Sequence, residues 1–191
     1  MSNNALFLDR DGVINNDYGY VFKKEDFHFT KDIFQLVKIA NNNNFKVIIV
    51  TNQAGIGRGF YSESDFLILN NWMINKFKEK EAFIDKVYFS PYHPTHGIGA
   101  YKKDDFSRKP NPGMLMQARK ELDINFSNSI LIGDKISDIE AGMAVDMGIN
   151  ILLKNTNTKE LHVKSVNSHL KLADSLKDAI DYFKEFSALV S

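Results

Sequence analysis

Short apolar runs alternate along this chain with segments of helical periodicity, and this alternation limits the folds open to it. Each run is too short for a buried helix but has the length of a strand that is covered on both faces. Helical segments between strands are typical of parallel strands joined by crossover helices. The sequence therefore predicts an α/β fold: a Rossmann-like, mostly parallel sheet of five to six strands, with helices on both faces and no large cap domain. The expected strands are 5–8, 46–50, 86–89, 129–132 and 150–153.

Apolar residues recur at helix spacing in the segments between these runs. Segment 31–40 has such a pattern, and four asparagines follow it. Ser62 and Asp65 have the spacing of a helix N-terminal cap, which predicts a helix from there to about Lys80. Further helices are expected from Pro112 through Leu122, from Ser137 or Asp138 to before Gly148, and from Asp174 or Ser175 through Phe183.

Composition narrows the class of protein. With 191 residues the chain suits a single domain, 1–191, that buries a real core. Lys plus Arg equals Asp plus Glu at 24 each, which favours neither nucleic acid nor a membrane as a partner. There is no cysteine, so disulfides and thiolate metal sites are excluded. No apolar run reaches membrane-spanning length and the first residues do not resemble a secretory signal, so we expect a cytoplasmic protein.

Two acids follow the first expected strand. Asp9 comes directly after it, and Asp11 precedes Gly12, which allows a sharp turn. Two interpretations have about equal weight on these residues alone. One is an ordinary surface turn, in which Asp and Gly are common. The other is an acid pair that shares a divalent cation, with one carboxylate as nucleophile and the other moving protons.

Thr51 and two amides follow the second strand, and glycines occupy 55, 57 and 59. The Thr51 hydroxyl and the backbone N–H groups could donate hydrogen bonds to phosphate oxygens. The alternative is a flexible glycine-rich loop without a ligand. A glycine-rich loop by itself is weak evidence for phosphate binding.

Arg108 and Lys109 lie together before an expected helix, in a segment stiffened by two prolines. Arg can hold a phosphate in a fork, and Lys supplies a compact point charge. An exposed basic turn is the commoner interpretation of two adjacent cations by themselves.

Asp134 follows the fourth strand as Asp9 follows the first, and Asp138 lies at the start of the next helix. Helix capping would explain Asp138. Asp134 is harder to explain as structural, because a charge directly after a buried strand needs a partner. Taken together, an acid pair, a hydroxyl, a lysine and a further acid at strand ends predict magnesium-assisted phosphoryl transfer.

The combined motifs resemble the haloacid dehalogenase (HAD) superfamily of phosphatases, whose DxD, T, K and GDxxxD motifs occur here in order. Within it, the chain is most similar to the heptose bisphosphate phosphatases. The resemblance covers about 5–153, and the tail fits as a closing strand and helix. It rests on FLDRDG at 7–12, GYV at 19–21, TNQ at 51–53, SPYHP at 90–94, RKP at 108–110 and GDK at 133–135.

This resemblance implies a role for each matching residue. Asp9 would form an aspartyl-phosphate, and Asp11 would protonate the leaving sugar oxygen and later activate water. The Asp9 carboxylate, the Asp11 backbone carbonyl and Asp134 would hold Mg²⁺, with Asp138 in support. Thr51 and Lys109 would bind the transferring phosphoryl group. Substrate contacts would come from Arg10, Asp17, Gly19, Tyr20, Asn52, Gln53, Arg108 and Lys135.

One departure from the resemblance concerns zinc. These phosphatases usually carry a C-x-H…C-x-C zinc loop before the Arg-Lys pair, in the segment that is 90–109 here. Ser90, Tyr92, Asp105 and Ser107 occupy the four ligand places, and His93 and His96 lie nearby but not at them. We therefore expect no zinc, and expect the loop to fold by hydrogen bonds and by packing of Tyr92, Tyr101 and Phe106.

The expected function is removal of the 7-phosphate from D-glycero-D-manno-heptose 1,7-bisphosphate, by a monomer with a small sugar phosphate as its partner. A histidinol-phosphate phosphatase is the alternative enzyme, although the Gly19-Tyr20-Val21 loop favours the heptose substrate. A polynucleotide 3′-phosphatase is disfavoured by the neutral charge. A non-catalytic sugar-phosphate-binding protein is the alternative from another class, and the intact Asp11 argues against it because binding alone needs no acid/base group.

Overall fold

The computed structural model describes residues 2–154 and 169–190, and the strands in that part of the chain form a single parallel sheet. The strand order is β3-β2-β1-β4-β5-β6, which confirms the predicted fold class. The sixth strand lies in the C-terminal tail and pairs with β5. The strands are β1 (Ala5–Leu8), β2 (Lys46–Asn52), β3 (Lys86–Ser90), β4 (Ile130–Gly133), β5 (Ile149–Leu153) and β6 (Leu170–Ala173).

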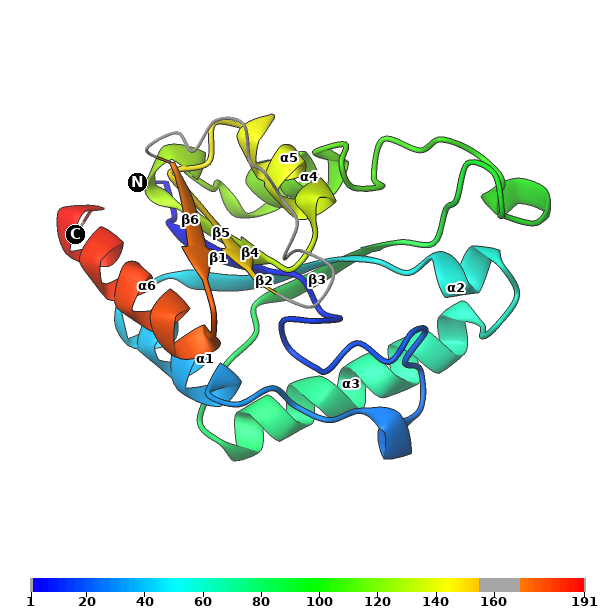
Figure 1. The fold of residues 1–191 in the computed structure, drawn as a ribbon, viewed down its shortest axis with the longest axis horizontal. Coiled ribbons are helices and arrows are strands. Elements are labelled where there is room, and N and C mark those ends of the chain that lie inside the picture. Colours follow the sequence, from blue (N-terminus) through cyan, green and yellow to red (C-terminus); the bar gives the residue numbers. More distant parts are fainter. Residues whose placement is uncertain (1, 155–168, 191) are drawn as a thin grey trace.

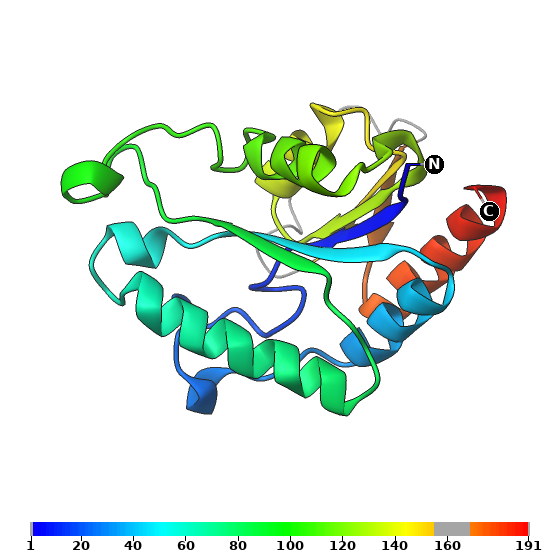
Figure 2. The ribbon, with the colours of Figure 1, turned by 180° about the vertical axis from the view of Figure 1, so that it is seen from behind.

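Helices cover both faces of the sheet (Figures 1 and 2). α1, α3 and α6 pack on one face and α4 and α5 on the other, each group with its own apolar core. A further short helix, α2, lies after β2. The helices are α1 (Ile33–Asn42), α2 (Ala54–Gly57), α3 (Glu63–Glu79), α4 (Gly113–Leu122), α5 (Ile136–Met143) and α6 (Leu176–Val190).

Strand β1 shows why the runs are continuously apolar. Leu6 and Leu8 belong to the core under α1, α3 and α6, whereas Phe7 belongs to the core under α4. Successive side chains of a strand point to opposite faces, so a strand covered twice has no polar face. Burying each of these side chains contributes about 1.5–3 kcal/mol.

Element boundaries follow local signals where those are strong. Ser62 caps α3, and its side chain and that of Asp65 bond each other's backbone N–H groups in a capping box, as predicted. β2 continues to Asn52, so Thr51 lies inside the strand and not beyond it. The glycine-rich segment after β2 is the short helix α2, so the alternative of a flexible loop is wrong.

The order in which strands are added to the sheet changes direction at β1. It builds outward through β2 and β3, then returns to place β4 on the other side of β1 and continues to β6. The carboxyl ends of β1 and β4 therefore flank the crevice in which sheets of this kind bind ligands. None of the helices in the described part of the chain has the length and apolar character needed to cross a bilayer.

Candidate active site

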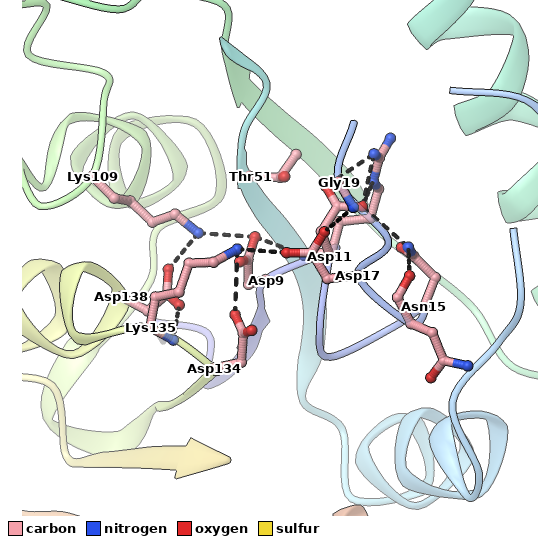
Figure 3. Close-up of polar contacts among 12 residues, drawn as sticks. Asp9, Asp11, Asn15, Asp17, Gly19, Thr51, Lys109, Asp134, Lys135 and Asp138 are labelled. Atoms are coloured by element: carbon pink, nitrogen blue, oxygen red, sulfur yellow. Dashed lines mark hydrogen bonds and ion pairs between the residues drawn. The ribbon is translucent and has the colours of Figure 1, made fainter. Parts of the chain in front are cut away.

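Asp9 follows β1 and is buried, with 5% of its surface exposed. Its Oδ1 accepts hydrogen bonds from the Arg10 backbone N–H at 2.7 Å and from Lys109 Nζ at 3.0 Å (Figure 3). Burial raises the pKa of Asp9, against the lowering effect of the Lys109 charge. These two contacts fix the orientation of the Asp9 carboxylate.

The ammonium group of Lys109 has three partners inside the protein. Nζ lies 2.6 Å from Asp138 Oδ1, 3.0 Å from Asp9 Oδ1 and 2.7 Å from the Val50 carbonyl oxygen. Burial by itself would lower the pKa of Lys109, but the charges of Asp138 and Asp9 outweigh that effect and raise it. Lys109 is therefore a fixed positive charge beside Asp9, where charge develops in phosphoryl transfer.

Asn52 holds the backbone of Lys109. Its Nδ2 donates to the Lys109 carbonyl and its Oδ1 accepts from the Lys109 N–H, each at 3.0 Å. These contacts join the end of β2 to the segment before α4. Asn52 lines the pocket as expected for a substrate contact, but its amide is used to place Lys109.

Three buried carboxylates converge at the ends of β1 and β4. One oxygen from each of Asp9, Asp134 and Asp138 lies within 4.8 Å of the other two. Gly12 makes this approach feasible, because a Cβ there would lie 2.2 Å from Asp134 Oδ2. Burial raises the pKa of Asp134 to about 7 against the effect of Lys135, and the charges of Asp9 and Asp138 add to the shift. Concentrated carboxylate oxygens of this kind fit a hard divalent cation such as Mg²⁺.

Asp138 has two roles in the structure. Its Oδ2 accepts from the Lys135 backbone N–H at 3.0 Å, which caps α5, and its Oδ1 pairs with Lys109. Gly133 allows this position, because a Cβ there would lie 2.2 Å from Asp138 Cβ. Asp138 therefore caps α5, as one interpretation predicted, and pairs with Lys109 at the same time.

The Asp11 carboxylate is held by donors from several directions. Arg10 Nη2 lies 2.9 Å from both of its oxygens, Asn15 Nδ2 donates to Oδ1 at 3.1 Å, and Gln53 Nε2 donates to Oδ2 at 3.0 Å. Asp11 still lines the pocket. Its carboxylate is outside the cluster formed by Asp9, Asp134 and Asp138.

Arg10 does not contact the pocket that the expected substrate would enter. It is 1% exposed, donates to the Val21 carbonyl at 2.7 Å and lies over the Phe66 ring. The structure thus places Arg10 behind Asp11, and gives no support to the expected substrate contact.

The pocket beside this cluster has a volume of about 550 Å³ and is lined on one side by cations. Arg108 reaches it while its Nη1 donates to the Tyr92 carbonyl at 3.0 Å. Lys135 reaches it from the start of α5 and pairs with Asp17 at 3.0 Å. Burial opposes the charged form of Lys135, but Asp134, Asp9 and Asp17 raise its pKa above the usual value. The expected substrate residues that line the pocket are Asp17, Gly19, Tyr20, Asn52, Gln53, Arg108 and Lys135.

The family of this chain follows from its sequence identity to two proteins of named activity. A D-glycero-alpha-D-manno-heptose-1,7-bisphosphate 7-phosphatase from Burkholderia mallei is 53% identical over 153 residues, covering 80% of this chain and 81% of that protein. The chain belongs to the heptose bisphosphate phosphatase family. The corresponding enzyme named for the beta anomer, from Vibrio cholerae, is 42% identical over 81% of this chain and 83% of its own length.

Two further comparisons concern part of the chain and its fold. A HAD-hydrolase-like family model matches residues 106–179. The crystal structure of D,D-heptose 1,7-bisphosphate phosphatase from B. bronchiseptica, complexed with magnesium and phosphate, superposes with a TM-score of 0.81. The superposition covers 95% of this chain and 98% of the B. bronchiseptica chain. Because the two are only 20% identical, the likeness supports the fold alone.

Hydrogen bonds connect three of the four places where the family resemblance predicts zinc ligands. Ser107 Oγ lies 3.0 Å from Ser90 Oγ and 2.6 Å from Asp105 Oδ1. Lys103 pairs with Asp105 at 2.8 Å and lies over the ring of Tyr92, the fourth place. Two hydroxyls, a phenol and one carboxylate do not fit a structural zinc ion, which takes thiolates and imidazoles.

The prediction that Tyr92, Tyr101 and Phe106 pack together in segment 90–109 is partly wrong. Tyr92 and Tyr101 are in contact, with ring centroids 6.1 Å apart. Phe106 is 62% exposed and takes no part in their contact. Polar and cation–π contacts from Lys103 replace the third aromatic ring in this part of the loop.

Among the residues of the site that sequence reasoning missed are Asn15 and Tyr61. Asn15 is fully buried and donates to Asp11. Tyr61 lines the pocket and its hydroxyl donates to Gln53. Neither residue stands at a strand end or in a recognisable spacing, so no signal in the sequence distinguishes it from ordinary core.

Proposed function

We propose that this chain removes the 7-phosphate of D-glycero-D-manno-heptose 1,7-bisphosphate. The observation that carries the proposal is the position of Lys109, which lines the pocket and lies 3.0 Å from Asp9. Relatives named for this activity support the choice of substrate. The cationic side of the pocket, formed by Arg108, Lys109 and Lys135, suits a ligand with two phosphates.

Asp9 is proposed to attack phosphorus, forming an aspartyl-phosphate while the bond to the sugar oxygen breaks. Asp11 gives a proton to that oxygen and later takes one from the water that releases inorganic phosphate. Lys109 and the Thr51 hydroxyl stabilise charge on the transferring group; a hydroxyl that accepts a bond from Gln53 still has its own proton to donate.

Mg²⁺ is proposed to bind Asp9, Asp134 and the Asp11 backbone carbonyl, with Asp138 in support. When bound there, Mg²⁺ supplies positive charge that offsets the negative charge of the acids and of the phosphoryl group. Zinc is not part of the proposal, because the residues at the expected zinc places bond one another. We further expect a cytoplasmic monomer with no nucleic-acid or membrane partner, which sedimentation and cell fractionation would test.

The test is phosphate release from purified protein with the alpha and beta heptose 1,7-bisphosphates and with histidinol phosphate. Phosphorus NMR should show loss of the 7-phosphate signal and retention of the 1-phosphate. Preferred hydrolysis of histidinol phosphate would support the alternative enzyme. Binding of the bisphosphates without phosphate release, in the presence of Mg²⁺, would show a non-catalytic binding protein.

A further inference from the structure

Every hydrogen-bonding group of the Gln53 side chain is used inside the protein. Nε2 donates to Asp11 Oδ2 at 3.0 Å and to Thr51 Oγ1 at 2.9 Å, and Oε1 accepts from the Tyr61 hydroxyl at 2.6 Å. The residue is 1% exposed. Gln53 therefore connects Tyr61 to Asp11 and Thr51, two residues with proposed roles in the reaction.

The direction of the Gln53 amide follows from the chemistry of its partners. Nε2 donates to both Asp11 Oδ2 and Thr51 Oγ1, so the NH₂ group of Gln53 faces these two residues. Oε1 then faces Tyr61, which must donate. Burial raises the pKa of Tyr61, so the phenol keeps its proton. Without this donor a buried acceptor would be left unpaired, which is costly, and Gln53 would move away from its present rotamer to find a partner.

Packing holds the Tyr61 ring independently of the reaction. The ring stacks on Phe22 with centroids 5.0 Å apart and planes 10° from parallel. Its other neighbour is Gly55 in α2, where a Cβ would lie 2.2 Å from Tyr61 Cε1. The absence of a side chain at Gly55 thus allows the Tyr61 ring to approach the backbone of α2. The sequence had placed Gly55 in a glycine-rich loop, with phosphate binding or flexibility as its role.

We propose that Tyr61 is a positioning residue for proton transfer, acting through Gln53 on Asp11. The proposal rests on the proposed function, because it assigns proton transfer to Asp11. The hydroxyl of Tyr61 fixes the Gln53 amide, and the amide keeps Asp11 Oδ2 in place at the pocket. Loss of the hydroxyl frees the Gln53 amide, and with it Asp11 Oδ2, while the ring of Tyr61 stays packed on Phe22.

Two substrates with different leaving groups separate this role from a merely structural one. A sugar alkoxide is a poor leaving group and needs the proton from Asp11, whereas p-nitrophenolate leaves without one. Tyr61→Phe should lower kcat/KM for the heptose bisphosphate by about tenfold, the effect of one lost hydrogen bond. For p-nitrophenyl phosphate the loss should stay below about twofold, since phosphoryl transfer itself is unaffected.

Tyr88→Phe is the matched control. It removes the hydroxyl of a tyrosine that is buried to a similar extent as a whole residue. This hydroxyl donates to Glu121 Oε2 at 2.9 Å, and Tyr88 lines no part of the pocket. Both substrates should be hydrolysed at wild-type rates. Thermal unfolding of each variant checks that the fold is kept.

Gln53→Met gives a second, independent measurement. It should lower kcat/KM for the heptose bisphosphate more than for p-nitrophenyl phosphate, although loss of the Gln53 bond to Thr51 lowers both. Adding Tyr61→Phe to it should cause no further change in the ratio of the two kcat/KM values, because both act through one contact. Equal losses on both substrates, or an additive double variant, would overturn the positioning role. Failure of the wild type to hydrolyse any sugar bisphosphate would instead overturn the proposed function.

Discussion

At the scale of single residues, Asp9 is the proposed nucleophile. Its contacts allow a substitution that removes the charge and keeps the hydrogen bonds. Asp9→Asn keeps the size of the side chain and an oxygen that can accept from Arg10 N–H and Lys109. A neutral amide cannot attack phosphorus, so we expect a loss of about 10³-fold or more in kcat with little change in the melting temperature.

Phosphate release and thermal unfolding measure these two effects. Asp181→Asn, on the exposed side of α6, is the control and should leave both unchanged. Near wild-type turnover by Asp9→Asn would show that another group is the nucleophile.

Asp105 predicts a pH dependence of stability. Against the effect of burial, hydrogen bonds from Lys103 and Ser107 lower the pKa of Asp105 from 3.8 to about 2. The folded state therefore binds this proton less readily than the unfolded state. The resulting stabilisation is present above about pH 4 and is lost as the pH falls toward 2.

Asp105→Asn should lower the free energy of unfolding by about 1 kcal/mol at pH 7, after discounting for solvent screening. The difference from wild type should shrink between pH 4 and pH 3. Urea unfolding at pH 7, 4 and 3 measures this difference, and a value that stays constant down to pH 3 would contradict the assigned contacts.

At the scale of elements, segment 90–107 leads directly into Arg108 and Lys109, so its order bears on phosphate binding. Ser90, Asp105 and Ser107 connect its two ends by hydrogen bonds, and Lys103 joins them to Tyr92. No thiol is available in the chain, and the rings of His93 and His96 contact each other at a tilt of 45°, with centroids 4.8 Å apart.

We predict that the purified protein holds no stoichiometric zinc. Elemental analysis should find none, and a zinc-selective chelator should leave activity unchanged. About one zinc per chain, lost together with activity in a His93→Ala and His96→Ala double variant, would overturn this expectation.

At the scale of the whole molecule, the order of the strands brings the acids together. β1 and β4 are neighbours although more than a hundred residues separate them, so Asp9 and Asp134 meet at their carboxyl ends. Their mutual repulsion opposes folding, and a bound divalent cation would offset it. Anything that binds only the folded state stabilises it by mass action.

Chelation should therefore stop phosphate release, and Mg²⁺ should both restore it and raise the melting temperature. Asp134→Asn should abolish the rise in melting temperature, which is a readout independent of turnover. Hydrolysis that survives thorough chelation would be inconsistent with a metal-assisted reaction.

Local patterns in the sequence determined the first five strands, most helix starts and the places of Asp9 and Asp134, whereas Thr51 proved to lie inside β2. These features depend on neighbours in the chain: side-chain alternation, helix spacing, a cap, and a charge at the end of an apolar run. Such signals act within a few residues, so they can be read without the fold. The alternation of elements then implied a parallel sheet whose strand ends meet at one edge.

Only the tertiary structure decided what the polar side chains bind. Asn52 bonds Lys109 across 57 residues of sequence, and Gln53 bonds Asp11 across 42. The same fold turned Arg10 inward, left Phe106 exposed and gave Gln53 its partner in Tyr61. Hydrogen bonds require atoms within about 3.5 Å, and periodicity along the chain carries no information on which distant side chains come that close.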